Sequence, residues 1–207
     1  EIRIIGDRQV GSGYFTNAQD IVEAIKPYSD KSGIYFTINS INPACYSREQ
    51  KNRIVFHPKN TTTDAEILTR DYVLIDLDPV RPSGVCSTKE EAIKAHEKGN
   101  DVYQFLLDNG FYEPIMLFSS SGIHLYLRCC MTNTPENTNI VKRFLQAIDM
   151  LFSDEYVSCD CSVYNAARIA RLPGSFSSKG ASNDASRPQR KCRFLNIPQE
   201  IKINTIE

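Results

Sequence analysis

The segment 72–79, with the sequence YVLIDLDP, constrains the fold of this chain more than any other. Its apolar residues recur at every second position and so face one side of a strand, while Asp76 and Asp78 face the other. Pro79 cannot donate to a β-ladder, so pairing ends just beyond the two aspartates. We therefore expect a strand with one face in an apolar core and an acidic end at a cleft.

Helix and strand patterns alternate irregularly along the chain, which indicates a mixed α/β or α+β core. Capping signals predict three helices, which begin after Asn17, after Thr88 and after Thr134. The second of these is expected to run to Asn109, with a break near Gly99. Strands are expected at 2–5, 33–39, 71–78, 115–118, 123–128 and 194–197.

The composition is that of a globular protein rather than a disordered or fibrous one. The chain has 207 residues, of which 41% are hydrophobic and 24% charged, and this size suits a single domain over residues 1–207. No stretch approaches the ~20 apolar residues of a membrane span. Seven cysteines without a regular framework indicate free thiols in a reducing compartment. Because the sequence begins with Glu1 rather than Met, we expect an excised fragment of a longer protein.

Positive charge is concentrated in one segment. Residues 1–167 include 16 basic and 22 acidic residues, whereas 168–193 holds seven basic residues against Asp184 alone. Five of the seven are arginines, and one arginine can bind two phosphate oxygens at once. Pro, Gly and Ser separate these basic residues, so they do not follow helical spacing. The block predicts binding of phosphates, from a nucleotide or a nucleic acid, with a solvated charged surface as the alternative. Its basic residues are Arg168, Arg171, Lys179, Arg187, Arg190, Lys191 and Arg193.

Three acids and a histidine each admit a functional and a structural interpretation. Neighbouring carboxylates repel each other unless a cation lies between them, so Asp76 and Asp78 indicate a site for Mg²⁺ or Mn²⁺. A solvated strand end is the alternative. His124 lies on the polar face of its strand, after a Ser/Gly turn that lets a ligand approach the backbone, but it could equally be a structural histidine. Asp160 could pair with a nearby arginine, and the C-D-C around it lacks the spacing of a zinc site.

Taken in order, these segments resemble the three motifs of the archaeo-eukaryotic primase superfamily. The matching stretches are LIDLDP at 74–79, SGIH at 121–124 and DCSVYNAARIARLPGS at 160–175. The resemblance covers residues 33–193 and is strongest to the primase-polymerase domains of phages, plasmids and other mobile elements. Each motif is weak by itself, and the ordered set is specific. Gly122 stands where many members of the superfamily have serine.

The resemblance implies an α+β fold of two packed α/β modules, with an RRM-like catalytic module and the site between them. It implies that Asp76, Asp78 and Asp160 hold two Mg²⁺ or Mn²⁺ ions. The residues that would contact the nucleotide are His124, Ser121, Gly122, Arg168, Arg171 and Lys179. We further expect Arg187, Arg190 and Arg193 to contact nucleic acid.

The function implied is that of a template-dependent nucleotidyltransferase, a DNA primase and DNA polymerase acting by two-metal catalysis in phage or mobile-element replication. Its expected partners are a single-stranded DNA template and primer, NTP or dNTP substrates, and a helicase or helical accessory domain elsewhere in the longer protein. We expect no zinc in this segment, no membrane, and a location in the bacterial cytoplasm. A two-metal nuclease and a non-catalytic nucleic-acid-binding replication domain are the alternatives.

Overall fold

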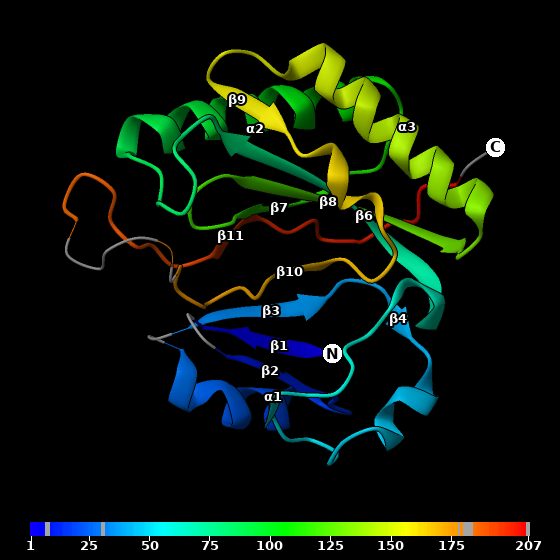
Figure 1. The fold of residues 1–207 in the computed structure, drawn as a ribbon. Helices are drawn as coiled ribbons and strands as arrows, with labels where there is room; N and C mark the ends of the chain where they lie inside the picture. The colour runs from blue at the N-terminus through cyan, green and yellow to red at the C-terminus, as the bar shows by residue number, and fades with distance from the viewer. Residues whose placement is uncertain (7–8, 30–31, 178, 180–183, 206–207) are drawn as a thin grey trace.

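The chain folds into two β-sheets and three helices in the computed structural model, which describes residues 1–6, 9–29, 32–177, 179 and 184–205 (Figure 1). The strands are β1 (Ile2–Ile5), β2 (Val10–Gly13), β3 (Gly33–Thr37), β4 (Ser40–Ile41), β5 (Val55–Phe56), β6 (Ile67–Pro79), β7 (Ile115–Phe118), β8 (Ile123–Thr132), β9 (Val157–Cys159), β10 (Ile169–Arg171) and β11 (Arg193–Asn196). The helices are α1 (Ala18–Ile25), α2 (Lys89–Asp108) and α3 (Pro135–Phe152), with 3₁₀ turns η1 (Lys26–Tyr28), η2 (Pro43–Ser47), η3 (Asp64–Glu66) and η4 (Cys161–Tyr164).

Both sheets are antiparallel throughout the described part of the chain. The first has the strand order β10-β3-β1-β2-β5, and the second has the order β11-β7-β8-β6-β4, with β9 paired to the end of β6. This arrangement confirms the expected mixed α/β architecture. The assignment of the second sheet to an RRM-like module stays a prediction. Within the described residues, no helix is long and apolar enough to cross a membrane.

The helix starts follow the predicted caps. The side chains of Asn17, Thr88 and Thr134 each accept a hydrogen bond from a backbone N–H in the first turn, and Glu91 completes a capping box with Thr88. The expected break in α2 near Gly99 is wrong. A Cβ at Gly99 would lie 2.8 Å from Ile123 Cγ2, so glycine lets the continuous helix approach the sheet closely.

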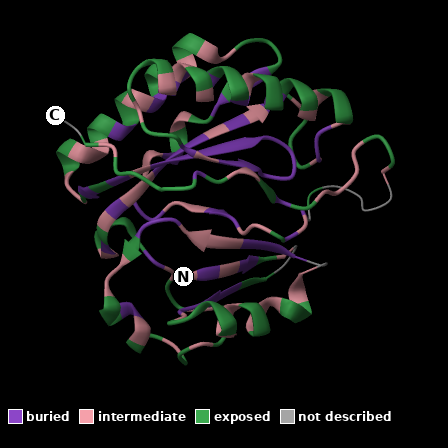
Figure 2. Cartoon of the chain, turned by 180° about the vertical axis from the view of Figure 1, so that it is seen from behind, coloured by how far each residue is buried: buried purple, intermediate pink, exposed green. Residues whose placement is uncertain are grey.

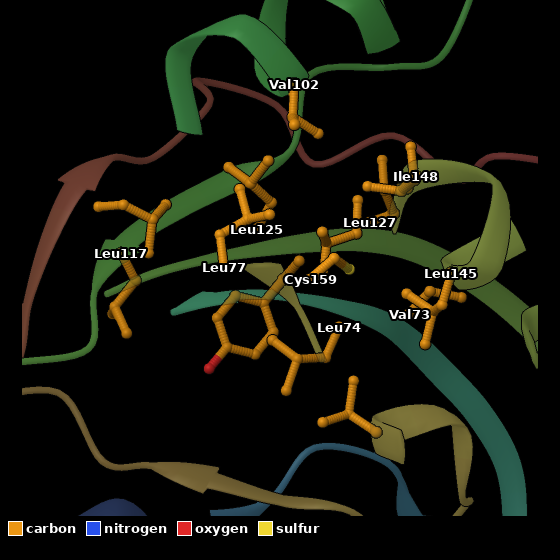
Figure 3. Close-up of a cluster of buried hydrophobic side chains, with 14 of the residues drawn as sticks. Val73, Leu74, Leu77, Val102, Leu117, Leu125, Leu127, Leu145, Ile148 and Cys159 are labelled. Atoms are coloured by element: carbon orange, nitrogen blue, oxygen red, sulfur yellow. The ribbon is translucent and has the colours of Figure 1, made fainter. Parts of the chain in front are cut away.

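The main apolar core lies between the second sheet and the helices α2 and α3. Figure 3 shows Val73 of β6 and Leu125 of β8 in one cluster with side chains from these helices. Val102 of α2 and Leu145 and Ile148 of α3 contribute to it, and each is almost fully buried. Burial of one such side chain stabilises the fold by roughly 1.5–3 kcal/mol. The outer surfaces of α2 and α3 are exposed while the sheets are largely buried (Figure 2). One face of β6 and β8 therefore packs against α2 and α3, and the other face is directed toward the first sheet.

Five short strands lie outside the ranges in which the sequence predicted strands: β2, β4, β5, β9 and β10. β2 occupies a glycine-containing stretch, and β10 lies inside the basic segment. β2 pairs with β1, the strand just before it in the sequence, whereas β10 pairs with β3 from the other end of the chain. β10 brings the start of the basic segment to the edge of the first sheet, opposite the acidic end of β6.

Candidate active site

The acidic strand and the histidine strand are neighbours in register. Asp76 of β6 is directly opposite His124 of β8, and Leu74 is opposite Tyr126. Because side chains alternate along a strand and the apolar set faces α2 and α3, these residues face the first sheet. The β-pairing thus places a carboxylate and an imidazole side by side at the cleft between the sheets.

A pocket of about 300 Å³ lies at this place and takes residues from both sheets. It brings together eight of the twelve predicted site residues: Asp76, Asp78, Ser121, His124, Asp160, Arg168, Arg171 and Lys179. Gly122, Arg187, Arg190 and Arg193 do not line it. Residues that the motifs did not identify also line it, including Tyr35, Arg81, Ser119, Ser120 and Ser177. Tyr35 lies in the middle of β3, and Arg81 follows the end of β6 by two residues.

Asp76 has a buried oxygen that lacks a hydrogen-bond donor among the described residues. This atom, Oδ1, lies 3.4 Å from His124 Nε2, an electrostatic contact that does not meet hydrogen-bond geometry. Burial acts to raise the pKa of Asp76, but His124, Lys179 and Arg168 together lower it below the ordinary value of 3.8. Asp76 is therefore an ionised carboxylate that lines a polar pocket and has one buried, unsatisfied oxygen.

The pKa of Asp78 is shifted in the opposite direction from that of Asp76. Burial and the charge of Asp76 raise its pKa above 3.8, although Arg81, 3.4 Å from its carboxylate, partly offsets this. The turn that carries Ser121 approaches Asp78 closely: a Cβ at Gly122 would lie 2.3 Å from Leu77 O and 2.6 Å from Asp78 Oδ1. Gly122 therefore acts by allowing this approach rather than by lining the pocket.

Asp160 follows β9 and joins the pocket next to Asp76. Its backbone N–H donates to Asp76 O at 2.9 Å, which fixes the two aspartates in adjacent positions. Its Oδ1 accepts a hydrogen bond from Ser162 N at 2.8 Å and caps η4. The side chain is exposed, so its second oxygen faces solvent or a ligand.

Basic side chains form the opposite wall of the pocket. Arg168 donates to Ser162 O, and its Nε is buried without a partner among the described residues. Arg171 is buried and donates to Phe176 O and to the hydroxyl of Tyr35, with its guanidinium 4.9 Å from the Tyr35 ring centroid. Arg171 is thus braced in place and orients Tyr35, whereas Lys179 is exposed at the rim.

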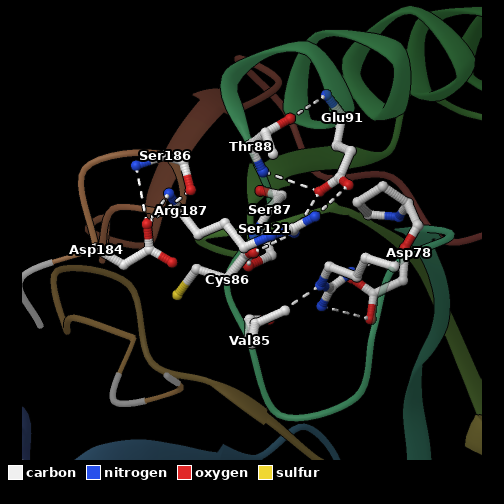
Figure 4. Close-up of polar contacts among 12 residues, drawn as sticks. Asp78, Val85, Cys86, Ser87, Thr88, Glu91, Ser121, Asp184, Ser186 and Arg187 are labelled. Atoms are coloured by element: carbon white, nitrogen blue, oxygen red, sulfur yellow. Dashed lines mark hydrogen bonds and ion pairs between the residues drawn. The ribbon is translucent and has the colours of Figure 1, made fainter. Parts of the chain in front are cut away.

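Two of the more distant arginines, Arg187 and Arg190, attach the basic segment to the start of α2. Arg187 donates to both carboxylate oxygens of Glu91 at 2.8 Å and to Cys86 O, as Figure 4 shows. Arg190 donates to Ser87 O at 2.7 Å, and Arg193 lies over the Phe118 ring. Nucleic-acid contact by Arg187, Arg190 and Arg193 stays a prediction.

The carboxylates of the pocket suit a hard divalent cation whose remaining ligands come from a bound substrate. Within the described ranges, no three His, Cys, Asp or Glu side chains are placed to hold one ion between them. Mg²⁺ is, however, commonly bound by one or two carboxylates together with substrate phosphates rather than by a complete protein cage. The unsatisfied oxygen of Asp76 and its repulsion with Asp78 fit this kind of site.

Comparisons with known proteins are sparse. No protein-family model matches the chain, and no curated protein matches its sequence significantly. Among solved structures, the polymerase domain from Mycobacterium tuberculosis Ligase D in complex with DNA is similar, with a TM-score of 0.42 and 16% identity. The match covers 77% of this chain and 52% of that one, so this chain spans about half the length of that structure.

Proposed function

We propose that this chain is a nucleotidyltransferase that adds nucleotides, from nucleoside triphosphates, to a 3′-hydroxyl on a nucleic-acid template. The observation that supports it is the pocket in which ionised Asp76, with its unsatisfied oxygen, lies opposite a wall of arginine and lysine side chains. The charge of a triphosphate extends beyond the oxygens that a metal ion contacts. Its binding therefore needs cations held by the acidic wall and also the arginine and lysine side chains of the basic wall. The motif resemblance extends the proposal to a primase-polymerase of the mobile-element type, with single-stranded DNA as template.

The acidic wall would hold the divalent cations. Asp76 and Asp78 would bind Mg²⁺ or Mn²⁺ together with phosphate oxygens, and Asp160 would add a ligand through the oxygen that does not cap η4. When bound, two such cations would lower the pKa of the 3′-hydroxyl and neutralise charge on the leaving pyrophosphate. The carboxylates would also position these cations, since the backbone sets the places of Asp76 and Asp78 on β6 and of Asp160 after β9.

The basic wall would bind and orient the nucleotide. Arg168 and Lys179 line the pocket, and Lys179 is exposed beside Asp76 and Asp78, so both would donate to phosphate oxygens. His124, opposite Asp76, would donate from Nε2 to the triphosphate. Arg171 would hold Tyr35 against the nucleotide, because it is buried and two of its N–H groups already donate to Phe176 O and to the Tyr35 hydroxyl.

Metal-dependent nucleotide binding tests the proposal. Calorimetric titration with dATP and ATP, in Mg²⁺ and in EDTA, should show binding that requires the metal and is lost in Asp76→Asn. Asp71→Asn is the matched control, because Asp71 lies on the same strand but pairs with Arg128 outside the pocket. Binding that persists in EDTA, or that survives Asp76→Asn, would contradict the proposal. A nuclease would be revealed by nucleotide release from DNA under the same conditions.

A further inference from the structure

Tyr126 and His124 form a buried polar pair that the motifs do not identify. They are two residues apart on β8 and therefore project from the same face of the sheet. The Tyr126 hydroxyl oxygen lies 3.1 Å from His124 Nδ1, and each residue is only 6% exposed. The Tyr126 ring also packs edge-on against both His124 and Tyr72, which fixes its orientation. The hydroxyl is therefore held at the ring nitrogen that faces away from Asp76.

The direction of this hydrogen bond follows from what faces the other ring nitrogen. His124 Nε2 lies 3.4 Å from Asp76 Oδ1, so a lone pair there would lie close to the negative charge of a carboxylate. A proton on Nε2 removes this repulsion. In the neutral ring Nδ1 is then an acceptor, since only one of the two nitrogens carries a proton. The neighbouring hydroxyl is placed to donate to it.

The chemistry of Tyr126 agrees with a donor role. Burial, together with the charge of Asp76, raises the pKa of Tyr126 well above its ordinary value of 10, so the phenol keeps its proton. Among the described residues, His124 Nδ1 is the hydroxyl's one hydrogen-bond partner. A buried hydroxyl donates where an acceptor is available, because an unmade hydrogen bond costs free energy.

We infer that Tyr126 is a positioning residue: its hydroxyl donates to His124 Nδ1 and thereby keeps the proton of the neutral ring on Nε2, directed into the pocket. The assignment of the tautomer does not depend on the proposed function. The role of Nε2 as a donor to the nucleotide phosphates does rest on the proposed function. With the proton on Nδ1, the ring would present a lone pair to the phosphates. With it on Nε2, the ring offers them a hydrogen bond without needing to be charged.

The ring nitrogens report the tautomer directly. We would label the histidines with ¹⁵N and record their ring resonances in the full chain without nucleotide at pH 8.5, above the ordinary histidine range. The chain has three histidines, so His124→Gln assigns the resonance. We expect a protonated Nε2 and an unprotonated Nδ1 in the wild-type chain and in Tyr72→Phe, the matched control on the adjacent strand. In Tyr126→Phe we expect a substantial population with the proton on Nδ1.

Two spectra would overturn the inference. One is a wild-type ring protonated on Nδ1, alone or together with Nε2, because the hydroxyl would then be the acceptor. The other is a tautomer in Tyr126→Phe identical to the wild type, because Asp76 alone would then set it. The wild-type spectrum serves as a test even if Tyr126→Phe does not fold.

Nucleotide titration separates this inference from the proposed function. With Mg²⁺, Tyr126→Phe should weaken dATP binding by about three- to tenfold, the range for losing part of a hydrogen bond to a charged group, and Tyr72→Phe should not. A wild-type chain that fails to bind dATP would contradict the proposed function while the spectra still decide the tautomer. Wild-type binding that is unchanged in Tyr126→Phe would overturn the positioning role alone.

Discussion

Asp76 and His124 are cross-strand partners, with His124 Nε2 3.4 Å from Asp76 Oδ1. The ladder between β6 and β8 sets this relationship, and the apolar residues that alternate with the pair anchor it to the core under α2 and α3. The sheet thus holds a carboxylate and an imidazole side by side in the lining of the pocket. Positioning on strands rather than loops suits a site that acts mainly by electrostatics.

Divalent metal should stabilise the folded chain through Asp78 and its neighbour. Asp76 and Asp78 repel each other, so a bound cation relieves repulsion that the unfolded chain does not have. At Mg²⁺ or Mn²⁺ concentrations ~100-fold above Kd, the gain is about 2.7 kcal/mol, visible as a higher unfolding temperature. EDTA should reverse it.

Asp78→Asn is the decisive variant for this effect. Without metal it should unfold at the same or a higher temperature than the wild type, because the repulsion is gone. With metal its temperature should rise less. An equal rise in both proteins would remove Asp78 from the cation site.

His124→Ala should mainly weaken the use of nucleotide. The ring is placed to donate to phosphate oxygens, and losing a hydrogen bond to a charged group costs about 1.5–3 kcal/mol, roughly tenfold or more in binding. The check is the apparent KM for dATP against kcat in steady-state extension assays. His96→Ala, on the exposed surface of α2, is the control. Normal nucleotide kinetics in His124→Ala would leave the histidine a structural one.

Gly122→Ala should damage the site although glycine has no side chain there. The added Cβ would lie 2.3 Å from Leu77 O and 2.6 Å from Asp78 Oδ1, so the turn or the end of β6 must move. Overpacking of this kind costs about 1–3 kcal/mol of folding free energy. Chemical denaturation measures it, and metal affinity should fall in parallel. Gly6→Ala, where the nearest atom is 3.5 Å away, should change neither. A Gly122→Ala chain with unchanged stability would show that the turn does not close on Asp78.

Asp154 predicts how stability depends on pH away from the pocket. The ammonium of Lys98 and the backbone N–H groups of Tyr156 and Val157 lower its pKa from 3.8 to about 2. A lowered pKa in the folded state adds stability above pH 3.8 and loses it as the pH falls toward about 2. Asp154→Asn should therefore be less stable than the wild type at pH 7, with the difference shrinking between about pH 4 and 2. Urea denaturation across this range measures the difference, and one that stays constant with pH would contradict it. Glu155→Gln controls for simple charge removal.

The sequence was sufficient to predict those features of the site that neighbouring residues determine. The alternation in 72–79 was enough to place Asp76 and Asp78 on one face, and the cap at Thr88 to start α2, because both properties are set by residues a few positions apart. β10 was missed because its strand form comes from pairing with β3. The Arg187–Glu91 pair was missed because its partners are 96 positions apart. Tyr126 gives no signal until the fold places its hydroxyl at His124 Nδ1.

Primer extension on a single-stranded DNA template tests the central proposal most directly. The reactions would contain Mg²⁺ or Mn²⁺ with deoxynucleotides and ribonucleotides in separate tubes, alongside Asp76→Asn and the Asp71→Asn control. We expect extended primer from the wild type and from Asp71→Asn, with activity at least ~100-fold lower in Asp76→Asn, as when a major electrostatic contribution to the transition state is lost. Extension that persists in Asp76→Asn, or its absence from the wild type with every metal and nucleotide, would contradict the proposed function.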